Sequence, residues 1–202
     1  MTARSDDHRR FTKQAWRDRI LDSRRALDPG ARAARAADLT RHALALAAST
    51  GGPVCAYLPV GTEPWSPEGV EQLRATGHEV LLPVVPDAPG PLDWASYTGP
   101  GSLAPGPIGL REPSGPRRGP GAVTAARLLL VPALAADRDG ARLGRGRGYY
   151  DRTLPLVTAG VPIVVVLDDD ELVDALPAEP YDHPVSAALL PRAGLTPLGK
   201  NG

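Results

Sequence analysis

The amino-acid sequence predicts a single α/β domain in which a mainly parallel central sheet is flanked by helices, after an N-terminal helical pair. Continuous apolar runs at 128–131 and 161–167 are typical of strands that are covered on both faces of a parallel sheet. Strand patterns alternate with helical patterns or long loops, and hairpin signals are few. The length of 202 residues suits one domain. We expect a flexible tail over 1–10 and the domain over 11–198.

Two amphipathic helices open the predicted domain. Trp16 and Ile20 recur at helical spacing within the first helix, which we expect at about 11–27. Asp28 and Pro29 then restart a helix as its N-cap and first residue, and the glycines at 51–52 end it after about residue 48.

The remaining elements follow from apolar runs bounded by proline and glycine. We expect strands at 54–58, 79–83, 92–97, 128–131, 161–167 and 185–190, and helices at 66–75 and 149–154. The glycine- and proline-rich stretch 99–121 predicts a loop without a helix, and the chain after residue 190 also predicts a loop. Trp94 is either a core residue or part of a pocket wall, and we assign it to the core. We interpret the acidic cluster 168–171 as helix capping and solvation rather than a metal site.

Composition excludes several function classes. A net charge of zero and a pI of about 6.9 argue against a broad nucleic-acid or membrane surface. The single cysteine, Cys55, cannot form an internal disulfide and lies in an apolar run, which favours a packed thiol and a reducing, cytoplasmic compartment. No apolar run approaches the roughly 18 residues of a membrane span. We expect a monomer whose partners are small molecules.

A loop rich in arginine and glycine follows the apolar run at 128–131. Gly144, Gly146 and Gly148 free the backbone to bring several N–H groups around one point, and the interleaved arginines surround that point with positive charge. The loop leads into a predicted helix with Asp151 in its first turn, which suits phosphate binding. Charge alone leaves a solvated basic loop equally open. Neither the P-loop pattern nor the dinucleotide-binding pattern is present.

The motifs of this chain resemble a known family. The run Arg-Leu-Gly-Arg-Gly-Arg-Gly-Tyr-Tyr-Asp-Arg at 142–152, preceded by Val-Pro-Ala-Leu-Ala at 131–135, closely resembles the signature of the 5-formyltetrahydrofolate cyclo-ligase (5,10-methenyltetrahydrofolate synthetase) family. Lys13 and Arg17 stand four residues apart, a spacing that by itself favours a solvated helix face. They match the ATP-contacting Lys-x-x-x-Arg pair of that family. The segment 57–64 looks like its second motif, which lines the folate site.

The resemblance implies an ATP- and Mg²⁺-dependent cyclo-ligase that converts 5-formyltetrahydrofolate to 5,10-methenyltetrahydrofolate, ADP and phosphate. The ATP-binding residues that it implies are Lys13, Arg17, Arg142, Leu143, Gly144, Arg145, Gly146, Arg147, Gly148, Tyr149 and Tyr150. Those implied for the folate are Leu58, Glu63, Arg145, Gly146, Arg147, Gly148 and Tyr149. Arg145 is the candidate catalytic residue, and Asp151 and Asp182 are the candidate magnesium ligands.

Two departures from the family pattern lie in or near the loop. Arg147 stands where many members have glycine, and Ala136 replaces a commonly aromatic residue. The segment 108–113 resembles the Glu-Pro loop near the substrate of the family, but we assign Glu112 no role. Two other functions stay open: a non-catalytic protein that binds reduced folate, and a protein of the same fold that binds a phosphate-containing ligand.

Overall fold

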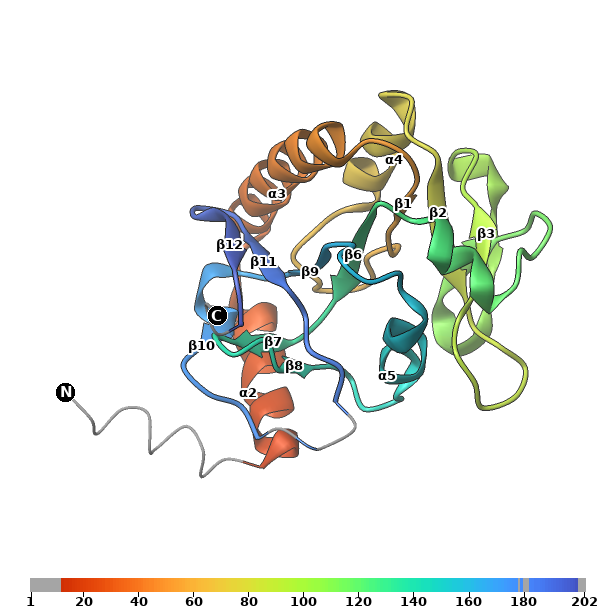
Figure 1. The fold of residues 1–202 in the computed structure, drawn as a ribbon. Coiled ribbons are helices and arrows are strands. Elements are labelled where there is room, and N and C mark those ends of the chain that lie inside the picture. The colour runs from red at the N-terminus through yellow and green to blue at the C-terminus, as the bar shows by residue number, and fades with distance from the viewer. Residues whose placement is uncertain (1–11, 178, 180–181, 200–202) are drawn as a thin grey trace.

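Seven strands form the main sheet of the computed structural model, which describes residues 12–177, 179 and 182–199 (Figure 1). The predicted tail, 1–10, therefore lies outside the described residues. In spatial order the strands are β12 (Gly194–Pro197), β11 (Ala187–Leu190), β9 (Ile163–Val166), β6 (Leu128–Pro132), β1 (Val54–Cys55), β2 (Val80–Val84) and β3 (Asp93–Ser96).

The five inner strands run parallel, and the two edge strands run antiparallel to their neighbours. β1 pairs in parallel with β2 and β6, β6 with β9, and β9 with β11. β3 pairs antiparallel with β2, and β12 with β11. The predicted mainly parallel sheet is confirmed. Every residue of β9 and β11 is buried, as the continuous apolar runs predicted.

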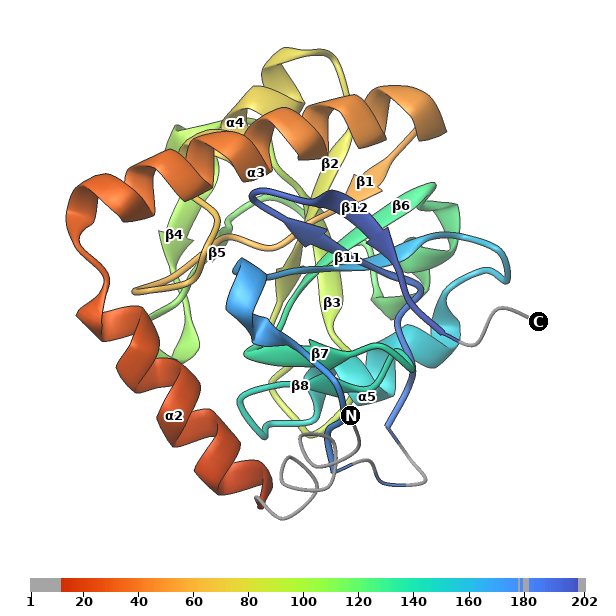
Figure 2. The ribbon, with the colours of Figure 1, turned by 90° about the vertical axis from the view of Figure 1, so that its left-hand side faces the viewer.

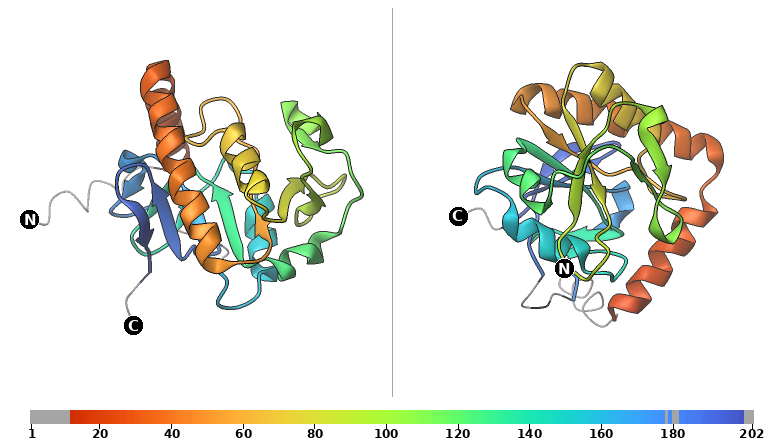
Figure 3. Two further views of the ribbon diagram at one scale, coloured as in Figure 1. Left: turned by 90° about the horizontal axis from the view of Figure 1, so that it is seen from above. Right: turned by 90° about the vertical axis from the view of Figure 1, so that its right-hand side faces the viewer.

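Helices α3 (Pro29–Thr50) and α4 (Pro67–Ala75) cover one face of this sheet (Figure 3). Their N-caps are the short polar residues Asp28 and Ser66, whose side chains accept hydrogen bonds from backbone N–H groups of the first turn. On the other face, Trp94 of β3 packs in one cluster with Leu154 and Val123, and Trp94 is a core residue as predicted. α5 (Tyr149–Thr153) lies on this side and continues as a 3-10 turn over Leu154–Leu156, which contains Pro155.

A smaller sheet contains β10 (Leu172–Val173), β7 (Ala135–Asp137) and β8 (Arg142–Leu143). Trp16 and Ile20 of α2 (Lys13–Ala26) pack on this sheet, so the first turns of α2 lie beside the loop that follows β8 (Figure 2). The carboxylate of Asp137 accepts hydrogen bonds from the N–H groups of Asp139 and Ala141, which closes the turn between β7 and β8. The segment predicted as loop is therefore partly a hairpin.

The glycine- and proline-rich stretch also contains more order than predicted. β4 (Leu103–Pro105) and β5 (Arg111–Pro113) form a two-stranded antiparallel sheet. Three 3-10 helices occur at Pro100–Ser102, Pro107–Gly109 and Pro120–Ala125. Each begins with proline, whose missing N–H is not needed at the first helical position. Short 3-10 helices of this kind are common as connectors between other elements.

Two predictions near the C-terminus were wrong in part. The segment after residue 190 is not only loop, because Gly194 at φ 68° supports the turn into β12. The acidic cluster does form a capping box, between Asp168 and Glu171 around the 3-10 helix Asp169–Glu171. Glu171 is not solvated, however, because it is buried against Arg24. Within the described part of the chain, no helix is both long enough and apolar enough to span a bilayer.

Candidate active site

A cavity of about 530 Å³ opens at the carboxyl ends of β1, β2 and β6. This is the edge at which ligands bind in open α/β sheets. Every site residue that the sequence predicted lines this cavity, namely Lys13, Arg17, Leu58, Glu63, Arg142, Leu143, Gly144, Arg145, Gly146, Arg147, Gly148, Tyr149, Tyr150, Asp151 and Asp182. These residues come from four distant parts of the chain, which the sheet and α2 bring together.

The glycine-rich loop is held against α2 by Arg17. Its guanidinium Nε donates a hydrogen bond to the carbonyl oxygen of Gly144 at 3.0 Å. Gly146 has a φ of 89°, and a Cβ there would lie 3.2 Å from Nη2 of Arg17. Gly148, the N-cap of α5, is left-handed at φ 67°. The left-handed backbone therefore favours glycine at both positions, and a Cβ at Gly146 would also crowd the guanidinium of Arg17.

The two aspartates predicted to bind metal each contact a cation of the cavity. Asp182 accepts from Lys13 Nζ at 2.8 Å, and Asp151 accepts from Arg142 Nη2 at 2.6 Å. The guanidinium of Arg142 also lies over the ring of Tyr150, 5.5 Å from its centroid. The basic residues at this end are thus partly balanced by carboxylates.

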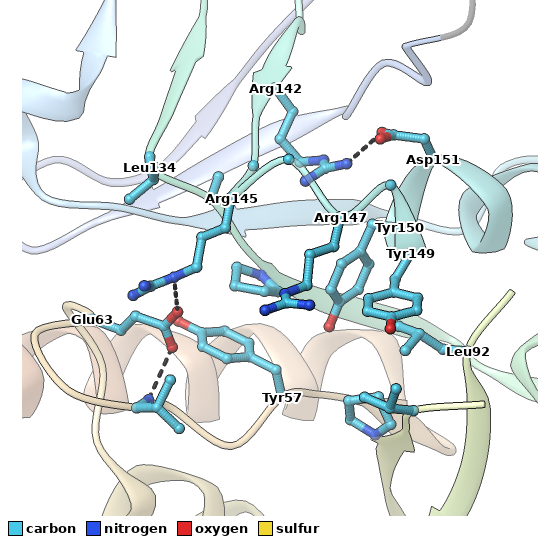
Figure 4. Close-up of a pocket in the computed structure, with 18 of the residues that line it drawn as sticks. Tyr57, Glu63, Leu92, Leu134, Arg142, Arg145, Arg147, Tyr149, Tyr150 and Asp151 are labelled. Carbon is cyan, nitrogen blue, oxygen red and sulfur yellow. Dashed lines mark hydrogen bonds and ion pairs between the residues drawn. The ribbon is translucent and has the colours of Figure 1, made fainter. Parts of the chain in front are cut away.

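Glu63 lies deeper in the cavity and faces Arg145 (Figure 4). Its Oε2 accepts a hydrogen bond from the N–H of Val60 at 3.0 Å, and its Oε1 lies 3.5 Å from Nε of Arg145. The Glu63 side chain is 9% exposed, whereas that of Arg145 is 49% exposed. Burial raises the pKa of Glu63 above its ordinary value, although the Val60 N–H and Arg145 act in the opposite direction.

The end of the cavity away from Lys13 is mainly apolar. It is lined by residues of β2, of the segments that flank β3 and β5, and of β6, including Leu82, Pro83, Val85, Leu92, Ile108, Leu110 and Pro132. Cationic and apolar walls in one cavity suit a ligand pair that combines phosphates with a flat, partly polar ring.

Sequence reasoning assigned no role to several cavity residues. Tyr57 stands next to Leu58 in the second motif, so its position in that motif was the available signal. The sequence predicts no role for Glu112; its Oε1 accepts a hydrogen bond from the N–H of Val85 at 2.8 Å, and the residue is 9% exposed. Glu179, 3.6 Å from Lys13 Nζ, had no sequence signal. The apolar wall was missed because its residues resemble ordinary core positions.

Nucleophilic cysteine chemistry does not fit this site. Cys55 is 1% exposed, and burial raises the pKa of its thiol to about 12. The prediction of a packed thiol is confirmed. Among the described residues, no group of three or more His, Cys, Asp or Glu side chains is arranged to hold a metal ion. A divalent ion here would need ligands from a bound phosphate or from water.

Comparison with known proteins decides the family. The family model described as the 5-formyltetrahydrofolate cyclo-ligase family matches residues 9–191. The chain belongs to this family. Among curated cyclo-ligases, the 5-formyltetrahydrofolate cyclo-ligase of Mycolicibacterium smegmatis is 43% identical over 191 residues, which cover 93% of this chain and 97% of that protein. The 5-formyltetrahydrofolate cyclo-ligase of Escherichia coli K12 is 34% identical over 124 residues, 60% of this chain and 68% of that protein.

Solved structures of cyclo-ligase relatives share the fold. The NMR structure of Aquifex aeolicus 5,10-methenyltetrahydrofolate synthetase matches with a TM-score of 0.72 at 24% identity, covering 95% of each chain. A 5,10-methenyltetrahydrofolate synthetase from Mycoplasma pneumoniae matches with a TM-score of 0.68 at 22% identity, covering 88% of this chain and 98% of that chain. The α/β architecture with its mostly parallel sheet is therefore the architecture of this family.

Proposed function

We propose that this protein uses ATP to convert 5-formyltetrahydrofolate into 5,10-methenyltetrahydrofolate, with release of ADP and phosphate. The observation that carries the proposal is that one cavity joins the cationic glycine-rich loop to Glu63 through Arg145, whose Nε lies 3.5 Å from Glu63 Oε1. The family membership of the chain supports the same reaction.

The chemistry explains why ATP is needed. The formamide oxygen of the substrate is a poor leaving group, so ring closure first requires its conversion to a phosphate ester. The formyl oxygen attacks the γ-phosphorus, and the bond from that phosphorus to ADP breaks. N10 then attacks the activated carbon and loses its proton, and phosphate leaves with the formyl oxygen. In phosphoryl transfer the protein mainly positions the reactants and neutralises the negative charge of the phosphates.

Arg145 is our candidate for stabilising the charge on the transferring phosphoryl group. Its side chain is half exposed in the free protein and pairs only loosely with Glu63, so it can turn toward a phosphate. Guanidinium groups bind phosphate oxygens in a bidentate manner, which combines charge with orientation. Lys13, Arg17 and the segment 142–150 would bind the rest of the nucleotide.

The folate would occupy the part of the cavity that contains Leu58 and Glu63. The pterin ring presents N–H donors at one edge, and a buried carboxylate is the natural acceptor for them. Glu63 is already fixed by the Val60 N–H, so it needs little ordering when a ligand binds. The segment 145–149 would contact both substrates, because the reacting atoms meet beside the loop.

Asp151 and Asp182 are suited to bind a magnesium ion together with the phosphates of a nucleotide. Mg²⁺ commonly takes one or two carboxylates together with phosphate oxygens and water, and a dedicated cage of three protein ligands is not required. Both aspartates line the cavity and offer hard oxygen donors. When bound, the ion supplies positive charge to the phosphates of ATP.

A coupled assay of ADP release tests the proposed function. With ATP and 5-formyltetrahydrofolate together we expect one ADP for each folate converted, and little ADP with ATP alone. A protein that only binds reduced folate would bind the substrate yet release no ADP. A protein selective for phosphate-containing ligands would bind ATP without competition or stimulation by folates. Either result would contradict the proposal.

A further inference from the structure

The hydroxyl of Tyr57 is a polar group in the cavity wall that the proposed function leaves without a role. Tyr57 is 3% exposed, and its hydroxyl has no hydrogen-bond partner among the described residues. Buried hydroxyl groups are normally bonded, because leaving one unpaired costs free energy. Tyr57 also lines the cavity, so a bound ligand is one possible source of the missing partner.

The ring of Tyr57 is packed against a second aromatic side chain. The ring contacts Trp65 at a centroid distance of 5.9 Å and an interplanar angle of 57°. Trp65 is itself fixed, because its Nε1 donates to Oγ1 of Thr40 on α3 at 3.1 Å. Gly69 allows this approach, since a Cβ there would lie 2.3 Å from Nε1 of Trp65. The hydroxyl is therefore held in one place before any ligand arrives.

Glu63 lies on the same side of the cavity, and the ring of Tyr57 is directed toward it (Figure 4). Burial raises the pKa of Tyr57 well above its ordinary value, and the neighbouring Glu63 acts in the same direction. The hydroxyl therefore keeps its proton at physiological pH and can donate. Tyr57 and Glu63 together present a donor beside an acceptor.

We propose that Tyr57 determines specificity in the folate part of the cavity by donating a hydrogen bond to an acceptor of the pterin ring, beside the N–H groups that Glu63 binds. This inference rests on the proposed function. On a pterin, the adjacent ring N–H and amino donors are flanked by acceptors, a carbonyl oxygen and a ring nitrogen. A carboxylate can serve only the donors, so the flanking acceptor requires a second group that donates. A neutral, fixed phenol meets that requirement.

Tyr57→Phe tests this role, because it removes the hydroxyl and keeps the ring on Trp65. The matched control is Tyr97→Phe: Tyr97 is 4% exposed, lies outside the cavity lining and interacts with Glu71, and burial together with Glu71 raises the pKa of its hydroxyl. Isothermal titration would measure the affinity for 5-formyltetrahydrofolate without nucleotide, and the affinity for ATP without folate. Thermal unfolding of each free variant would report whether the change affects the fold.

We expect Tyr57→Phe to weaken folate binding about 3- to 10-fold, the usual effect of one neutral hydrogen bond. ATP affinity should stay unchanged. The free variant should be at least as stable as the wild type, because an unpaired buried hydroxyl is gone. Tyr97→Phe should keep both affinities and lose stability.

Unchanged folate affinity in Tyr57→Phe would overturn the role of Tyr57 while leaving the proposed function intact. Equal weakening of folate and ATP would also overturn it, because Tyr57 would then act through the fold. Failure of the wild type itself to bind the reduced folate would remove the proposed function and this inference together.

Discussion

Glu63→Gln separates the two halves of the proposed site. The substitution removes one negative charge, and the remaining side-chain oxygen can still accept from the Val60 N–H. A hydrogen bond to a charged partner contributes about 1.5–3 kcal/mol, so its loss should weaken folate binding about 10- to 100-fold. ATP affinity should change little, because Glu63 lies at the folate end and Arg145 is released rather than removed.

The stability of Glu63→Gln should move in the opposite direction from its affinity. Burial raises the pKa of Glu63 in the folded protein above the ordinary 4.5, so folding favours the neutral form. The contribution of Glu63 to the free energy of unfolding is therefore greatest below pH 4.5 and is lost as the pH rises through the raised pKa. Glutamine is neutral throughout, so the variant should be at least as stable as the wild type at pH 8.

Titration calorimetry with each substrate, combined with thermal unfolding at pH 5 and pH 8, measures both effects. Glu68→Gln is the control, because Glu68 is exposed at the start of α4 and lies outside the cavity. Equal losses of folate and ATP affinity would refute the division of the site. If Glu63→Gln is clearly less stable than the wild type at pH 8, the claim that burial disfavours the charged form of Glu63 is wrong.

Three further predictions concern charge and backbone. Arg145→Ala should keep the fold, since the side chain is half exposed, and lower turnover at least about tenfold (about 1.4 kcal/mol); unchanged steady-state rates would remove Arg145 from the mechanism. Glu171→Ala leaves the charge of Arg24 buried and unpaired, so chemical denaturation should show a decrease of about 3–5 kcal/mol in the free energy of unfolding. Asp22→Ala breaks an exposed ion pair and should lower this free energy by less than about 1 kcal/mol. Similar decreases in the free energy of unfolding for both variants would contradict the claim that a buried ion pair matters more than an exposed one. Gly146→Ala should weaken ATP binding about tenfold in calorimetry, because its φ is 89°; wild-type affinity would mean that the loop conformation is not needed.

Local sequence signals predicted the frame of this fold. The apolar run at 128–131 and the β-branched run at 161–167 contain the adjacent parallel strands β6 and β9, since residues buried on both faces have few alternatives. Asp28 with Pro29 and Ser66 with Pro67 began helices as expected. β12 was missed because Leu195 is 46% exposed, so the strand lacks the apolar pattern of the inner strands.

The sequence predicted those site residues that belong to a local motif within one segment. It did not predict the contacts that form between segments far apart in the sequence. The glycine-rich loop and Glu63 have local motifs, and the structure brings them together. The contacts of Lys13 with Asp182, and of Glu112 with the N–H of Val85, join positions far apart in sequence. The free hydroxyl of Tyr57 depends on Trp65 and Thr40 packing behind it, which no single segment encodes.

The absorbance of the methenyl chromophore tests the central claim most directly. The purified protein is mixed with 5-formyltetrahydrofolate and magnesium, and the chromophore is followed before and after ATP is added. We predict that absorbance rises only after ATP is added and that the rise is proportional to the ADP formed. No rise with both substrates, or the same rise without ATP, would contradict the account.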